Sequence, residues 1–204
     1  VLSSSEIAIE TLPIDVSSIE IIPEVGSSGS FGADALIVAD VAGDDDQDFI
    51  FSDALSSKIY VLIGLRECSV TQIDLNALPA CAQLITIVQK SDGSPSFFGS
   101  AVTVGNVIGN TKKNLIIGDQ SVNFGEGELY VLNLASISTT QTITLDTIAA
   151  PHLTITGDPG IAPGFSFFGG SPAVGDLNND GAHELIIGHT GRKNSEIGPL
   201  AGGA

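Results

Sequence analysis

The chain has 204 residues, and its 24 acidic and 7 basic side chains give it a formal net charge of −17. Such an acidic surface repels phosphate backbones, which argues against a nucleic-acid partner, and it suits divalent cations or basic proteins. Hydrophobic residues make up 43% of the chain, yet Met and Trp are absent and Gly occurs 24 times. Abundant Ile, Val and Leu between glycines favour short strands, so we predict an all-β fold.

Three copies of one unit follow the opening segment VLSSSEIAIETLPIDVSSIEIIP. Repeat 1 begins at Phe31, repeat 2 at Phe98 and repeat 3 at Phe168, so the period is about 67 to 70 residues. Each copy contains Phe-Gly, an apolar strand, a polar loop and a second apolar strand. Repeats 1 and 2 continue with a third strand, KIYVLIG or ELYVLNL, and a fourth, QLITIVQ or HLTITG.

Four short antiparallel strands in a repeated unit are typical of a propeller blade. We therefore predict blades over residues 31–97 and 98–167, the first half of a blade over 168–204, and the second half of a blade over 1–30. An unpaired half-blade would expose sheet edges. The alternatives are a piece of a longer propeller chain, closure of three blades on themselves, or completion of one chain's end by the next chain's beginning.

The polar loop of repeat 1 is rich in acidic residues. Its alternating positions one, three, five, seven and nine carry Asp40, Ala42, Asp44, Asp46 and Asp48. Calcium takes six to eight oxygen ligands, and a tight loop can present them from alternate residues. Alanine at position three removes a ligand side chain, so a water molecule would fill that place. Position seven normally contributes its backbone carbonyl. We predict a calcium site here.

The loop of repeat 2 has amides in place of acids. Asn106, Asn110 and Asn114 stand at positions one, five and nine, with two lysines between the last two. We expect this loop to keep its shape by neutral hydrogen bonding and to bind no ion, or to be an ordinary solvated loop.

The loop of repeat 3, GDLNNDGAHE, has the best set of oxygen ligands. The candidate ligands are Asp176, Asn178, Asp180, the carbonyl of Ala182, and Glu184. Three carboxylates so close together repel each other without a cation, which predicts a second calcium site. The alternative is an Asp-Gly hairpin turn without a metal.

The two cysteines, Cys68 and Cys81, have a spacing that can close a loop across neighbouring strand ends. We predict a disulfide, and with it an oxidising, extracellular compartment. Two free buried thiols are the alternative. The CxxC spacing of zinc and redox sites does not occur.

These copies resemble the FG-GAP repeats of integrin α-subunit head domains and related secreted proteins. Phe-Gly is present in all three copies, whereas the Gly-Ala-Pro portion is degenerate and stands as Ser52-Asp53-Ala54 in repeat 1. The loop of repeat 3 matches the family's calcium loop, with Asn for the middle Asp and Glu for the last. The resemblance covers nearly the whole chain. It implies a seven-bladed β-propeller with calcium loops that serves adhesion or ligand recognition.

The predicted function is therefore a non-enzymatic, extracellular, calcium-stabilised module for adhesion or protein–protein recognition. Its expected partners are a protein ligand or neighbouring copies of itself. The first alternative is a structural unit that assembles head to tail into a fibre or surface layer, and the second is a propeller hydrolase. None of the three histidines belongs to an HExxH motif. The Thr-rich residues 138–148 are either a site of O-linked glycans or an exposed β-strand.

Overall fold

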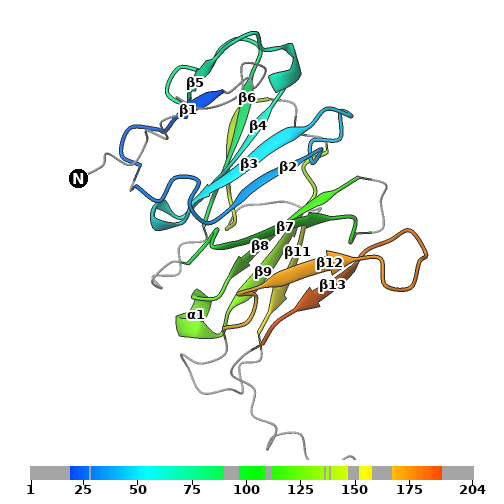
Figure 1. The fold of residues 1–204 in the computed structure, drawn as a ribbon. Coiled ribbons are helices and arrows are strands. Elements are labelled where there is room, and N and C mark those ends of the chain that lie inside the picture. The colour runs from blue at the N-terminus through cyan, green and yellow to red at the C-terminus, as the bar shows by residue number, and fades with distance from the viewer. Residues whose placement is uncertain are drawn as a thin grey trace, which may run out of the picture.

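The structure of the protein, a computed structural model, describes residues 19–27, 29–89, 97–108, 112–135, 137, 139–146, 152–157 and 167–189. The predicted all-β class is confirmed (Figure 1). Most of the predicted half-blade at 1–30 and the end of the chain beyond residue 189 lie outside the described residues.

Thirteen strands and three short helical turns make up the described part of the chain. The strands are β1 (Glu20–Ile22), β2 (Leu36–Ala39), β3 (Asp48–Asp53), β4 (Lys58–Ile63), β5 (Gln72–Asp74), β6 (Gln83–Val88), β7 (Ala101–Gly105), β8 (Asn114–Asp119), β9 (Glu128–Leu132), β10 (Gln141–Thr144), β11 (His152–Thr156), β12 (Pro172–Gly175) and β13 (Glu184–Ile187). The helical turns are η1 (Ala54–Ser56), η2 (Leu65–Glu67) and α1 (Val122–Gly125).

Each repeat contributes its own antiparallel sheet. Repeat 1 forms the order β6-β4-β3-β2, repeat 2 forms β11-β9-β8-β7, and the described part of repeat 3 forms the pair β12-β13. The first and second strands of each repeat pair in the same register, because Ala39 lies opposite Asp48, Gly105 opposite Asn114, and Gly175 opposite Glu184. Equivalent residues of the three repeats therefore occupy equivalent places.

Two further strands link neighbouring sheets, and sequence analysis did not predict their role. β10 belongs to repeat 2 but pairs in parallel with β6, the fourth strand of repeat 1. β5 lies between the third and fourth strands of repeat 1 and pairs in parallel with β1, which precedes that repeat. We call β5 and β10 the linking strands. Each linking strand pairs with the strand that comes just before its own repeat in the chain. The same arrangement therefore occurs twice.

Three apolar clusters bury both faces of these sheets. The cluster between repeats 1 and 2 contains Ile50 and Ile85 from one sheet and Leu115 and Ile117 from the other. The intervening residue Ile116 belongs to the cluster between repeats 2 and 3. Successive residues of a strand point to opposite faces, so β8 supplies side chains to two cores. The third cluster, around Phe51 and Tyr60, covers the other face of repeat 1.

The glycine of the Phe-Gly motif lies where one repeat approaches the preceding one. Gly169 has a φ of +79°, and a Cβ at this position would come 2.8 Å from the carbonyl oxygen of Glu128 in repeat 2. The approach is closer still at Gly118, where a Cβ would lie 1.8 Å from the carbonyl oxygen of Gly169. The preceding phenylalanine contributes to the same interface, since Phe168 packs against the cluster between repeats 2 and 3.

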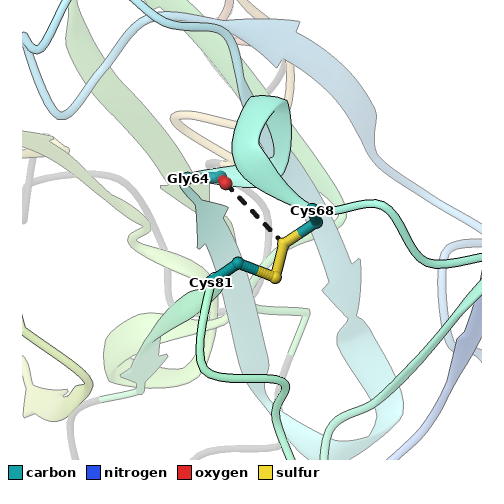
Figure 2. The surroundings of a disulfide bond; sticks show 3 residues. All are labelled: Gly64, Cys68 and Cys81. Carbon is teal, nitrogen blue, oxygen red and sulfur yellow. Dashed lines mark hydrogen bonds between the residues drawn. A yellow bond between two sulfur atoms is a disulfide. The ribbon is translucent and has the colours of Figure 1, made fainter.

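The predicted disulfide is confirmed: Cys68, which directly follows η2, is bonded to Cys81, which precedes β6 (Figure 2). The two Cα atoms lie 5.4 Å apart, and the Sγ of Cys68 is 3.7 Å from the carbonyl oxygen of Gly64. The bond closes the loop that contains linking strand β5. In the chain-entropy description a closed loop of this size contributes about 3 kcal/mol to stability.

Replacing Gly169 by alanine tests the close approach between repeats. Gly32 is the equivalent residue of repeat 1 and has a similar φ of +69°, but a Cβ there would meet nothing within 4 Å. The positive-φ penalty is shared by both alanine variants, so their difference reports the inter-repeat contact alone. We expect Gly169→Ala to lower the free energy of unfolding by about 1–3 kcal/mol more than Gly32→Ala does, measured by urea denaturation. Equal losses would contradict the contact.

Candidate metal centre

The candidate ligands lie in the loops that join the first and second strands of the repeats. Figure 1 shows the turns from β2 to β3 and from β12 to β13 on the same side of the protein. Position one of each loop directly follows the first strand, and position nine is the first residue of the second strand. These positions are Asp40 and Asp48 in repeat 1, Asn106 and Asn114 in repeat 2, and Asp176 and Glu184 in repeat 3.

In repeat 1 the side chain at position nine closes the loop. One carboxylate oxygen of Asp48, Oδ2, accepts the backbone N–H groups of Val41 and Ala42, each at 2.8 Å. Asp40 accepts the N–H of Gly43 at 2.6 Å through its Oδ1 atom. Asp44 at position five accepts the N–H of Asp46 at 3.1 Å through its Oδ1 atom.

Repeat 2 uses the same closure with an amide. The Oδ1 atom of Asn114 accepts the N–H groups of Val107 and Ile108 at 3.1 and 3.0 Å. The expected neutral hydrogen bonding of this loop is therefore present. In the described part of this loop, two buried polar atoms have no hydrogen-bond partner, namely the Nδ2 of Asn114 and the Oδ1 of Asn106.

In repeat 3 the oxygens are mostly used within the loop. Asp176 accepts the N–H groups of Asp180 and Gly181 through separate carboxylate oxygens, at 3.1 and 2.9 Å. Glu184 accepts the N–H of Leu177 at 2.7 Å with one oxygen and the amide of Asn178 at 2.9 Å with the other. The Oδ1 of Asp180 accepts the N–H of Ala182 at 2.8 Å. Loop positions one to six, Asp176 to Gly181, are solvent-exposed.

Asp48 differs from its equivalents because it combines complete burial, charge and an unused oxygen. Its side chain is 0% exposed, and its Oδ1 atom has no hydrogen-bond partner among the described residues. Burial raises the pKa of Asp48 above its ordinary value, and the nearby charges of Asp44 and Asp40 raise it further, while the N–H bonds from Ala42 and Val41 oppose the shift. A positive group beside the Oδ1 atom would lower the cost of keeping Asp48 charged.

Two basic side chains contact the acidic loop from outside it. Arg66, in helical turn η2 just before Cys68, donates to the Oδ1 of Asp46 at 2.8 Å. Lys112 from repeat 2 lies 3.2 Å from the Oδ1 of Asp45. Sequence analysis missed both partners, because the contacts depend on how η2 and the second sheet are placed. These two contacts are made to Asp46 and Asp45, and the Oδ1 atom of Asp48 has no hydrogen-bond partner among the described residues.

The residues of repeat 1 fit a hard cation better than those of repeat 3. In the ranges that the structure describes, no three His, Cys, Asp or Glu side chains are grouped closely enough to hold a metal ion. In repeat 3, both oxygens of Asp176 and of Glu184 already accept protein donors. In repeat 1, Asp48 has an oxygen to spare, and Asp40 and Asp44 each accept through one oxygen only.

A pocket of about 390 Å³ adjoins the loop of repeat 1. Its lining includes Asp44 on the loop, Ile63 and Gln83 from the sheet of repeat 1, and Ile137 from repeat 2. The Oε1 atom of Gln83 is buried and has no hydrogen-bond partner in the described residues. The pocket therefore combines an apolar wall, a carboxylate and a free carbonyl-type acceptor, which suits a basic side chain with an aliphatic stem.

A second polar cluster ties the segment before repeat 1 to its sheet. Glu24 accepts from the Nζ of Lys58 at 2.6 Å and from the hydroxyl of Tyr60 at 3.2 Å, while Ser27 and Ser30 donate to Asp53. Burial raises the pKa of the Tyr60 hydroxyl, and the charge of Glu24 raises it further. These contacts anchor the turn that contains the first Phe-Gly pair.

No protein-family model matches the chain, and a search of the curated proteins found no relative. Within the described ranges, no helix is long and apolar enough to cross a membrane.

Replacing Asp48 by asparagine tests the cost of its buried charge, and repeat 2 supplies the design because it has Asn114 at the equivalent position. In the presence of a chelator at pH 7, we expect Asp48→Asn to raise the free energy of unfolding by about 1 kcal/mol or more, because asparagine keeps the acceptor and removes the charge. The reverse variant, Asn114→Asp, should lower it.

The pH dependence follows from the raised pKa of Asp48. A raised pKa means that folding favours the protonated form of Asp48. The stability that protonated Asp48 contributes is complete below its unfolded-state pKa, and it is lost as the pH rises through its folded-state pKa. The difference between Asp48→Asn and the original chain should therefore grow with pH over that window and vanish in acid. A difference independent of pH would contradict the assignment.

Proposed function

We propose that this chain is a non-enzymatic, extracellular recognition module of FG-GAP type, built from β-propeller-type repeats and stabilised by calcium. The observation that carries this proposal is the buried Asp48 carboxylate, whose Oδ1 atom has no partner in a loop that also contains Asp40 and Asp44. An unpaired buried carboxylate is costly, and a bound cation is the usual way in which proteins offset that cost.

The chemistry of the loop selects the class of ion. At the ligand positions of repeats 1 and 3, every side chain that can bind a metal offers a carboxylate or amide oxygen, and His183 lies at position eight, outside those positions. Oxygen ligands suit calcium or magnesium rather than zinc, and a flexible loop with many carboxylates suits the larger ion. In repeat 1, Asp40, Asp44 and Asp48 would hold the ion once binding draws their carboxylates together, since they are not grouped closely enough in this structure. The charge of the ion would offset that of Asp48.

Repeat 3 is a second candidate with a different requirement. Its ligand oxygens accept the loop's own N–H groups, so an ion would compete with hydrogen bonds that are already formed. Its loop is also solvent-exposed, which weakens electrostatic attraction. We therefore infer that repeat 1 binds calcium more tightly than repeat 3.

The recognition role is supported by charge and by the pocket beside the loop of repeat 1. The net charge of −17 favours basic partners, since it steers them toward the acidic loops. The Oε1 of Gln83, which has no partner among the described residues, would accept the N–H groups of a lysine or arginine, while Ile63 and Ile137 contact its aliphatic stem. The proposed ligand is thus a protein segment with an exposed basic side chain.

Calcium should raise the melting temperature of the chain, and a chelator should reverse the rise. We expect Asp48→Asn to remove most of this shift, and Asp176→Ala with Asp180→Ala to remove a smaller part. Asp34→Asn is the matched control, because Asp34 is an exposed acid outside the candidate loops. Differential scanning calorimetry with and without calcium measures the shift. An unchanged melting temperature for the original chain would sink the metal assignment.

A short peptide with a central arginine or lysine should bind at the pocket of repeat 1. Its affinity should fall as the salt concentration rises, because the attraction is electrostatic. Gln83→Leu should weaken binding about fivefold or more, since it removes one acceptor while keeping the size of the side chain. Isothermal titration with a peptide that has norleucine in place of the basic residue is the control. Equal affinity for both peptides would exclude this pocket as the recognition site.

A further inference from the structure

The outer edge of β11 is open at a place where the equivalent strand of repeat 1 is paired. β11 pairs with β9 on one side, and no described strand pairs with its other side. β6, the fourth strand of repeat 1, lies between β4 and linking strand β10. An open strand edge offers unpaired N–H and C=O groups to another strand.

The two fourth strands can be aligned residue by residue from their hydrogen bonds. The N–H of Gln89 donates to the carbonyl of Ser57 just before β4, and the N–H of Gly157 donates to the carbonyl of Gly127 just before β9. Gly157 is thus equivalent to Gln89, which places Thr156 at the position of Val88.

Both linking strands bind their neighbours in one register. Leu75, directly after β5, donates its N–H to the carbonyl of Ile22, and Leu145, directly after β10, donates its N–H to the carbonyl of Val88, each at 3.1 Å. Two residues earlier, Ile73 lies opposite Ile21. In the same way, Ile143 lies opposite Ile87. The same parallel register occurs in both pairs, so it predicts how a further strand would pair with an equivalent strand edge.

The linking strands share a sequence pattern that occurs a third time. Residues 73–78 read IDLNAL and residues 143–148 read ITLDTI. Residues 7–12 read IAIETL, with aliphatic residues at the same first, third and sixth places and an acid at the fourth. Ile7 also precedes Ile21 by the same number of residues as Ile73 precedes Ile87. The sequence around Ile7 therefore matches that of the linking strands.

We propose that the open edge of β11 binds residues 6–10 of a second copy of this chain as a parallel strand. In the register of the two observed pairs, Ile7 of the second copy lies opposite Ile155, and the N–H of Ile9 donates to the carbonyl of Thr156. The assembly is head to tail, since the edge and the strand are on different parts of the chain. This inference is independent of the calcium proposal.

The apolar surface that β11 exposes is further support for a strand from a second copy at this edge. Leu153 is 48% exposed, whereas Ile85, its equivalent in β6 beside a linking strand, is 0% exposed. The first and third aliphatic residues of the observed linking strands enter the apolar clusters: Ile73 and Leu75 are buried, and Leu145 is buried beside Ile143. The equivalent residues of the second copy would cover the side of β11 that packs against the cluster between repeats 2 and 3.

The same placement covers two further exposed faces. Leu36 and Val38 on β2 are 66% and 64% exposed, and Ile186 on β13 is 48% exposed. The residues equivalent to Leu36 and Val38 in repeat 2 are Val102 and Val104, which pack against the cluster between repeats 1 and 2. Repeat 1 of a second copy would follow repeat 3 of the first as repeat 2 follows repeat 1, so these faces would meet.

Two variants block the two sides of this contact separately. Because successive N–H groups of a strand point in opposite directions, the N–H of Thr154 points away from β9 when that of Gly157 points toward it. Thr154→Pro removes an outward donor and spares the bonds to β9. Ile7→Lys with Ile9→Lys places charges at the aliphatic positions of the strand. Thr154→Val is the matched control, since it keeps the N–H.

Sedimentation velocity of the 204-residue chain and its variants tests the proposal. We expect concentration-dependent association of the original chain and of Thr154→Val, weakened about tenfold or more in Thr154→Pro and in the Ile7/Ile9 variant. Mixing the two blocked variants should give a one-to-one dimer and nothing larger, because one offers an intact strand and the other an intact edge. Association should persist in a chelator, which separates this result from the calcium test.

Three results would overturn the proposal. An original chain that stays monomeric at its highest soluble concentration would show that no second copy occupies the edge. Association that both variants leave unchanged would place the contact elsewhere. A failure of the two blocked variants to form a dimer would exclude the head-to-tail pairing, provided that each has a melting temperature close to that of Thr154→Val. If Thr154→Pro fails to fold, the Ile7/Ile9 variant alone decides.

Discussion

Burial of both faces of a sheet is the constraint on which this fold depends, and the sheet of repeat 2 shows it most fully. Successive residues of β8, such as Ile116 and Ile117, belong to different apolar clusters, so this one strand stabilises contacts on both faces of its sheet. A sheet of this kind has no solvent-facing side and cannot be stable without a neighbour on each face. The stability of each repeat is therefore shared with the next, as in other repeat proteins.

The linking strands and the Phe-Gly turns are two consequences of that sharing. β10 joins the hydrogen-bond ladder of the preceding repeat, which adds directional bonds to an interface that apolar packing alone would leave free to slide. Gly169 allows the backbone of repeat 3 to approach that of repeat 2 more closely than any side chain would permit. Packing, backbone pairing and close approach together fix how each sheet is placed on the one before it.

The position-nine residues show how one backbone requirement can be met with different electrostatic consequences. Asp48, Asn114 and Glu184 all accept N–H groups from the start of their own loop. The amide meets this need without charge. The glutamate uses both oxygens and remains partly accessible, whereas the buried aspartate keeps one oxygen unused. Among the three residues at position nine, only Asp48 of repeat 1 therefore combines a buried charge with an oxygen free to bind another group.

Sequence reasoning succeeded where the signal was local or compositional. The abundance of β-branched residues indicated the all-β class, and the spacing of Cys68 and Cys81 indicated their disulfide. It offered an exposed β-strand over residues 138–148, the range that contains β10, but it missed β5 and the parallel pairing of both linking strands, because QID and QTIT are short and polar. Their strand conformation results from pairing with residues of another repeat, which a local pattern does not encode.

The candidate site was also only partly predictable. The alternating acids identified the loops and were interpreted as ligands, with a metal-free hairpin turn as the alternative in repeat 3. The hydrogen bonds that the acidic residues at position nine accept from the loop backbone were not foreseen. The surplus oxygen of Asp48 depends on the complete burial of this side chain. The contact between Arg66 and Asp46 depends on where η2 is placed beside the loop of repeat 1. Neither property can be read from the loop sequence, since both arise from residues distant in the chain.

The contact between Lys112 and Asp45 has an evolutionary consequence. The lysine belongs to the repeat whose loop has lost its acids, and it reaches the acidic loop of the preceding repeat. An exposed pair of this kind contributes little to stability, yet Gly43 in the same loop leaves room for the lysine stem. Shuffling the repeats by recombination would separate these complementary surfaces. Although the units derive from one pattern, their order along the chain is a property that selection can preserve.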